Sequence, residues 1–166
     1  MKIFLVGMPG SGKTTLGLQL AELLLMEFVD LDKLIEEQEG KSIQQMFAED
    51  GEDYFRQVES KLLLEYSGSP KSFVMATGGG APCYYNGMEV INETGLSVFI
   101  DVTIDELLSR VTKHSDRPLL KTEDREMTRN TLSNLLATRL PVYSRAHIVL
   151  KNPTITALKH AIAFRM

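Results

Sequence analysis

The chain of 166 residues is 43% hydrophobic and 24% charged, a composition typical of a globular protein with a sizeable core. Its 18 basic and 22 acidic side chains leave a net charge of −4, which disfavours a dedicated nucleic-acid-binding protein. Cys83 is a single cysteine without a disulfide partner, and no apolar run is long enough to span a bilayer. We expect one domain over residues 1–166, without a membrane partner, monomeric and cytoplasmic.

The first informative segment is Gly7–Thr14, which matches the phosphate-binding pattern G-x-x-x-x-G-K-[ST]. It lies between an expected strand, Lys2–Val6, and an expected helix, Thr15–Leu25. In this context backbone N–H groups close around phosphate oxygens at the start of a helix. Lys13 is expected to reach the β- and γ-phosphates and Thr14 to ligate Mg²⁺, so the sequence predicts binding of a nucleoside triphosphate.

Further apolar segments with strand character alternate with helical patterns along the chain. They are Glu27–Val29, Ser72–Ala76, Leu96–Asp101 and His147–Leu150. The alternation predicts an α/β fold, in which a parallel sheet is covered by helices on both faces.

The segment Lys33–Tyr66 is helical in character and has no strand signal, and Gly40 and Gly51 divide it. Ser42 is expected to cap a helix over Ile43–Glu49. Ligands bind outside the carboxyl ends of the strands, so a helical insertion of about residues 33–66 is a candidate holder of a second substrate.

A second irregular stretch, about residues 112–124, is polar and contains Arg117 and Pro118. It is expected to be either a surface loop or a mobile lid over the phosphates. The helix that follows, Arg125–Leu140, is expected to end before Pro141.

Two carboxylates, Asp30 and Asp32, follow the short strand at Phe28 and Val29. In extended chain, alternate residues point to the same side, so both carboxylates are expected to face one site beside the phosphate loop. Asp30 is a candidate for holding Mg²⁺ through water, and Asp32 for accepting a proton from an attacking hydroxyl. The alternative, that Asp32 only caps a helix starting at Lys33, is left open by these residues.

The glycine triplet Gly78–Gly80 either presents bare N–H groups to a ligand or forms a tight turn. Arg56, Arg117 and Arg139 are candidates for binding phosphate and carboxylate oxygens in bidentate fashion, although each alone is typical of a solvated surface. Arg110 is expected either to stack on a base or to lie on an exposed helix face.

Taken together, these elements resemble shikimate kinases. The resemblance extends from Ile3 to Leu150 and rests on motifs in a specific order. The motifs are the phosphate loop, Asp30-x-Asp32, Phe55-Arg56-x-x-Glu59, Gly78-Gly79-Gly80, Arg117-Pro118-Leu119-Leu120 and Arg139-x-Pro141-x-Tyr143. It implies a fold like that of nucleoside monophosphate kinases, and transfer of the γ-phosphoryl group of ATP to the 3-hydroxyl of shikimate in aromatic amino acid biosynthesis.

The resemblance also implies a role for each matching residue. ATP would be bound by Gly10, Ser11, Gly12, Lys13, Thr14, Thr15, Arg110 and Arg117. Mg²⁺ would be held by Thr14 and, through water, by Asp30. Shikimate would be bound by Asp32, Arg56, Gly78, Gly79, Gly80 and Arg139, with Phe47 and Phe55 as an apolar wall. Lys13, Asp32 and Arg117 would be catalytic, and Glu59 would hold Arg56.

Two departures and three alternatives stand beside this resemblance. The glycine expected after the first helix is replaced by Leu24-Leu25-Met26-Glu27, and the adenine-loop region at Lys151–Pro153 matches loosely. A gluconate kinase is disfavoured by the FRxxE and RPLL motifs, and a nucleoside monophosphate kinase by the lack of an obvious base pocket. A nucleotide-dependent switch predicts partner binding without small-molecule turnover.

Overall fold

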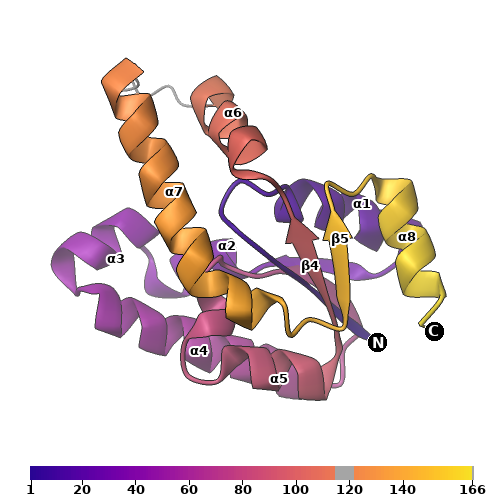
Figure 1. Cartoon of the computed structure of the whole chain (residues 1–166). Helices are drawn as coiled ribbons and strands as arrows, with labels where there is room; N and C mark the ends of the chain where they lie inside the picture. The colour runs from indigo at the N-terminus through magenta and orange to yellow at the C-terminus, as the bar shows by residue number, and fades with distance from the viewer. Residues whose placement is uncertain (115–121, 166) are drawn as a thin grey trace.

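Five parallel strands form one sheet in the order β2-β3-β1-β4-β5. Figure 1 shows two of them, β4 and β5, side by side. The computed structural model describes residues 1–114 and 122–165. The strands are β1 (Lys2–Val6), β2 (Glu27–Asp30), β3 (Phe73–Ala76), β4 (Leu96–Asp101) and β5 (Ile148–Lys151). All four strand pairings are parallel, so the predicted α/β class and the expected strand positions are confirmed.

The helices cover both faces of this sheet. They are α1 (Lys13–Leu24), α2 (Leu31–Glu39), α3 (Ile43–Glu49), α4 (Glu52–Gly68), α5 (Gly87–Thr94), α6 (Ile104–His114), α7 (Thr122–Tyr143) and α8 (Ile155–Ala163), with a short 3₁₀ turn η1 (Ala81–Cys83). Figure 1 shows α1 and α8 on one side of the sheet and α4 and α5 on the other. Among the helices so described, none is long and apolar enough to cross a membrane.

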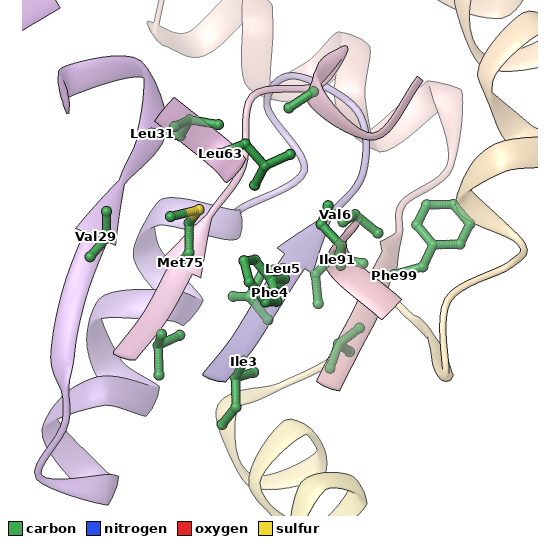
Figure 2. Close-up of a cluster of buried hydrophobic side chains, with 14 of the residues drawn as sticks. Ile3, Phe4, Leu5, Val6, Val29, Leu31, Leu63, Met75, Ile91 and Phe99 are labelled. Atoms are coloured by element: carbon green, nitrogen blue, oxygen red, sulfur yellow. The ribbon is translucent and has the colours of Figure 1, made fainter. Parts of the chain in front are cut away.

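The core is built around β1, whose residues Ile3–Val6 are fully buried. Figure 2 shows these side chains between Val29 and Met75 on one flank and Phe99 on the other. Phe4 and Phe73 meet edge to face, with ring centroids 5.6 Å apart. A fully buried side chain of this size contributes about 1.5–3 kcal/mol, so β1 is firmly held where the phosphate loop leaves it.

The direction in which successive strands are added to the sheet reverses at β1, which makes this position a topological switch point. From β1 the chain builds β2 and β3 on one side, and then crosses to β4 on the other side. In open parallel sheets, ligands bind at such a point, outside the carboxyl ends of the strands.

The helical insertion folds as its glycines and its serine predict. Gly40 ends α2 with φ 68°, and Gly51 precedes α4 with φ 85°, both in the left-handed region that favours glycine. Ser42 caps α3 by accepting a hydrogen bond from Gln45 N at 3.1 Å, and Ser42 N donates to Gln45 Oε1 at 2.9 Å. This reciprocal capping box sets the start of α3.

Two helix ends differ from simple expectation. The last turn of α1 ends at Leu25, which takes φ 54° without a glycine and is 94% exposed. The long helix α7 was expected to end before Pro141, but it continues to Tyr143. Because Pro141 has no backbone N–H, α7 loses one hydrogen bond of its helical ladder at this residue. The complete burial of Tyr143 in the core supplies a reason for α7 to continue.

The expected lid is only partly described. Residues 112–114 belong to α6 and residues 122–124 to α7, so these ends are helical rather than irregular. Arg117 lies outside the described residues.

Candidate active site

A cavity of about 730 Å³ opens at the carboxyl ends of the strands. Its walls come from the phosphate loop, from the residues after β2, β3 and β4, and from the segment after β5. The lining residues are Pro9–Leu16, Asp30, Asp32, Ala76, Thr77, Gly79, Val102, Arg110, Val111, Asn152 and Pro153. The nucleotide residues predicted in the loop, the two aspartates and the adenine-loop segment therefore share one cavity.

The phosphate loop is shaped by glycines and by a buried lysine. Gly7 has φ 147°, and a Cβ there would lie 2.8 Å from the Ile100 carbonyl oxygen. The Lys13 ammonium donates to the carbonyl oxygens of Gly7 and Met8, each at 2.8 Å. Burial lowers the pKa of Lys13 to about 8, while the carboxylates of Asp32 and Asp30 oppose this fall. The loop thus holds a buried ammonium group at the amino end of α1.

Asp30 links the phosphate loop to the start of α2. Its Oδ2 accepts a hydrogen bond from Thr14 Oγ1 at 3.0 Å. Its Oδ1 accepts from Asp32 N at 3.1 Å and from Lys33 N at 3.3 Å, so Asp30 is the cap of α2. The alternative that Asp32 caps this helix is therefore wrong, and so is the expectation of extended chain, because Asp32 already lies in the first turn of α2.

The donor set beside the loop fits Mg²⁺. The Thr14 hydroxyl and the Asp30 carboxylate are hard oxygen donors, 3.0 Å from one another. Over residues 1–114 and 122–165, no group of three or more His, Cys, Asp or Glu side chains is arranged to hold a metal on its own. Magnesium sites in proteins commonly take only one or two protein oxygens and complete the shell of the ion with water and phosphate oxygens, so these two groups are the candidate ligands.

The Asp32 carboxylate reaches the glycine triplet, Gly78–Gly80, which we call the glycine shelf. A Cβ at Gly78 would lie 2.8 Å from Asp32 Oδ1 and 2.8 Å from Glu59 Oε2. Burial raises the pKa of Asp32, and the charge of Asp30 raises it further, while Lys13 opposes the rise. The structure therefore places a carboxyl group with enhanced proton affinity between the phosphate loop and the shelf.

The arginines predicted to bind a carboxylate meet at the same shelf. A Cβ at Gly79 would lie 2.8 Å from Arg139 Nη1, and a Cβ at Gly80 would collide with the Arg56 guanidinium. The shelf also turns into η1, where Ala81 N donates to Gly78 O at 3.2 Å. The triplet is therefore a turn, as one of the two alternatives predicted, and its presentation of N–H groups to a ligand stays a prediction. Its missing side chains leave room for four charged groups, those of Asp32, Glu59, Arg139 and Arg56.

Arg56 is held on several sides. Its Nη1 lies 2.8 Å from Glu59 Oε1, as expected, and its Nε lies 3.4 Å from Glu52 Oε1. The Tyr84 ring covers the guanidinium at 4.2 Å, and the Phe55 ring lies 5.1 Å away. Although burial opposes it, the Glu59 carboxylate raises the pKa of Arg56, which keeps the guanidinium cationic.

The two phenylalanines expected to form an apolar wall contact one another beside this arginine. Phe47 and Phe55 lie with ring centroids 4.9 Å apart, Phe55 buried and Phe47 40% exposed. Their packing joins α3 to α4 next to Arg56.

Arg110 crosses the phosphate loop. Its Nη1 donates to Gly10 O at 3.3 Å, and its Nε pairs with Glu106 Oε1 at 3.1 Å. Arg110 therefore lines the cavity, and its side chain does not lie on a helix face that points away from the site.

The sequence analysis gave no role to several residues of this site, although Pro9 and Tyr143 lie inside two of its motifs. Tyr143 donates to Gly79 O at 2.5 Å, Pro9 packs against Gly79, and Tyr84 and Glu52 enclose Arg56. Tyr143 lies four residues after Arg139 and shares its face of α7, but the expectation that the helix ends before Pro141 concealed this relation. For Tyr84 no local signal points to Arg56, because the contact depends on how η1 packs against α4.

Comparison with known proteins agrees with this geometry. A family model described as shikimate kinase matches residues 9–163. A shikimate kinase of Parabacteroides distasonis is 41% identical over 149 residues, covering 89% of this chain and 85% of the relative. One of Clostridium botulinum is 39% identical over 152 residues, covering 90% of this chain and 86% of the relative.

Solved structures give the same result. Shikimate kinase of Bacteroides thetaiotaomicron aligns with a TM-score of 0.86 and 34% identity, over 99% of this chain and 96% of that one. Shikimate kinase of Acinetobacter baumannii in complex with shikimate aligns with a TM-score of 0.86 and 34% identity, over 99% of this chain and 93% of that one.

Proposed function

Since this chain belongs to the shikimate kinase family, we propose that it transfers the γ-phosphoryl group of ATP to the 3-hydroxyl of shikimate, giving shikimate 3-phosphate and ADP. One observation carries the proposal most directly. The Asp32 carboxylate and the guanidinium groups of Arg56 and Arg139 all approach the glycine shelf, next to the phosphate loop. A cyclic acid with hydroxyls needs this combination of cations and a hydrogen-bond acceptor.

The phosphate loop is proposed to bind ATP. The backbone N–H groups of Gly10–Gly12 and the start of α1 at Lys13 favour the phosphate oxygens. Lys13 exchanges its two loop carbonyl partners for the β- and γ-phosphates, where a cation stabilises the charge of the transferring group. We infer that the rest of the nucleotide extends along the cavity, which Arg110 and the Asn152–Pro153 segment line.

Mg²⁺ is proposed to bind at the Thr14 hydroxyl, with Asp30 assisting through the water shell of the ion. When bound, it neutralises charge on the β- and γ-phosphates. The hydrogen bonds that Lys33 N and Asp32 N donate to Asp30 fix the carboxylate in place for this role.

The glycine shelf is proposed to bind shikimate. Arg56 and Arg139 hold its carboxylate from two sides, and Phe47 and Phe55 form the apolar wall. Asp32 accepts a hydrogen bond from the 3-hydroxyl and aligns that oxygen with the γ-phosphorus. Phosphoryl transfer depends mainly on such positioning.

Arg117 stays a prediction as the catalytic cation of the lid, because it lies outside the described residues. The chain is also proposed to act as a monomer in the cytoplasm. Sedimentation velocity with and without nucleotide tests the first of these two proposals.

A coupled ADP-release assay with ATP and Mg²⁺ tests the function. We expect release that depends on shikimate and not on gluconate or nucleoside monophosphates. Turnover with one of those acceptors would overturn the substrate assignment while leaving the phosphate loop in place. Nucleotide binding without any acceptor-dependent release would favour the switch instead.

A further inference from the structure

Tyr143 is the last residue of α7 and is completely buried. Its ring packs on Phe99 of β4, with centroids 5.1 Å apart and an interplanar angle of 37°. Its hydroxyl donates to the carbonyl oxygen of Gly79 at 2.5 Å, across 64 positions of sequence. The end of α7 is thereby tied to the middle of the glycine shelf.

This hydrogen bond sets the orientation of one peptide group. The Gly79 carbonyl and the Gly80 N–H belong to the same planar trans peptide, so they point in opposite directions. Within residues 1–114 and 122–165, no backbone acceptor pairs with the Gly80 N–H. Because glycines have wide backbone freedom, a shelf of three needs an external contact to hold one peptide orientation.

The same helix carries the acid-binding arginine. Arg139 and Tyr143 are four residues apart and share a face of α7. Both side chains approach Gly79. Arg139 Nη1 lies 2.8 Å from the position that a Cβ at Gly79 would take, and the Tyr143 hydroxyl donates to the Gly79 carbonyl oxygen. Arg56 approaches the neighbouring Gly80 from α4.

We propose that Tyr143 is a positioning residue, whose hydroxyl fixes the Gly79–Gly80 peptide so that the Gly80 N–H donates to the acid group held by Arg56 and Arg139. This inference rests on the proposed function. Burial raises the pKa of Tyr143 to about 12, so the hydroxyl stays protonated and keeps donating over the working pH range.

The test is Tyr143→Phe, which removes the hydroxyl and keeps the ring on Phe99. We expect the KM for shikimate to rise about five- to tenfold, the effect of losing one well-made hydrogen bond. The KM for ATP should stay within about twofold, because the hydrogen bonds that Lys13 makes to its loop do not involve Gly79.

Ser97→Ala is the matched control. It removes another buried hydroxyl, which donates to Asn92 Oδ1 at 2.6 Å near the amino end of β4, at the opposite edge of the sheet from the site. It should lower the melting temperature and leave both KM values unchanged. Equal changes in the two variants would reduce Tyr143 to a purely structural residue.

A second measurement tests the same proposal if the Tyr143→Phe variant does not fold. Site-specific replacement of Tyr143 by 3,5-difluorotyrosine keeps the hydroxyl and its shape but lets it ionise at lower pH. The KM for shikimate should then rise with pH before that of the parent protein, and superimposable profiles would overturn the inference. If the parent protein releases no ADP with shikimate, it is the proposed function that fails.

Discussion

Nη1 of Arg56 lies 2.8 Å from Oε1 of Glu59, one turn further along α4, and both side chains are buried. Burial raises the pKa of Glu59, while the Arg56 charge pulls it back. The pair keeps a fixed cation beside the glycine shelf, where a mobile or neutral group would bind an acid poorly.

Glu59→Ala is therefore expected to lower the free energy of unfolding by about 3–5 kcal/mol, because it leaves a buried guanidinium without its main partner. Glu65→Ala is the control on the same helix, since Glu65 is exposed and its contact with Lys61 is 3.9 Å long. That control should cost less than about 0.5 kcal/mol. Urea unfolding at pH 7 measures both, and similar values for the two variants would contradict the importance of the buried pair.

Arg139→Ala is expected to raise the KM for shikimate by at least tenfold, or about 1.4 kcal/mol, while changing the KM for ATP much less. Its Nη1 lies at Gly79, where the acid group is proposed to bind. Arg129→Ala is the control on the same helix, because Arg129 is 45% exposed and pairs with Asp105 on the surface. Steady-state kinetics with each substrate varied would refute the role of Arg139 if both KM values rose equally.

Lys13→Met is expected to abolish turnover and yet to stabilise the ligand-free protein. The folded pKa of about 8 lies below the usual 10.5, so between these pH values the unfolded chain binds more protons. The free energy of unfolding contributed by Lys13 therefore rises with pH from about 8 to about 10.5, and below pH 8 the full cost of burying the charge is present.

Unfolding of the parent protein and of Lys13→Met in parallel from pH 7 to pH 10 checks this linkage. The free energy of unfolding of the variant should exceed that of the parent protein by about 1–3 kcal/mol at pH 7, and this difference should become smaller as the pH rises. A variant that is less stable at pH 7 would show that the carbonyl hydrogen bonds of Lys13 outweigh its burial.

Leu25→Gly is expected to stabilise the protein by about 0.5–1 kcal/mol, because glycine takes the left-handed conformation without strain. The leucine is 94% exposed, so little packing is lost. Leu23→Gly gives the opposite sign, since Leu23 is 51% exposed but lies inside α1, where glycine costs about 1 kcal/mol. Melting temperatures of the two variants that shift in the same direction would refute this account of the helix end.

Short-range features were determined by the sequence alone. The phosphate loop, the five strands and the Ser42 cap each depend on residues within a few positions of one another, so their signals survive without knowledge of the fold. The same holds for Gly40 and Gly51, whose positive φ values end or begin a helix locally. Family membership followed from several such motifs in a fixed order.

The tertiary structure decided the contacts that join distant segments. Asp30 rather than Asp32 caps α2, since Asp30 is also tied to Thr14 of the phosphate loop. The helix α7 continues through Pro141 because Tyr143 finds a buried place against Phe99 and Gly79. These choices depend on burial and hydrogen bonds between residues far apart in sequence, whose free energy exists only once the sheet and its helices have packed.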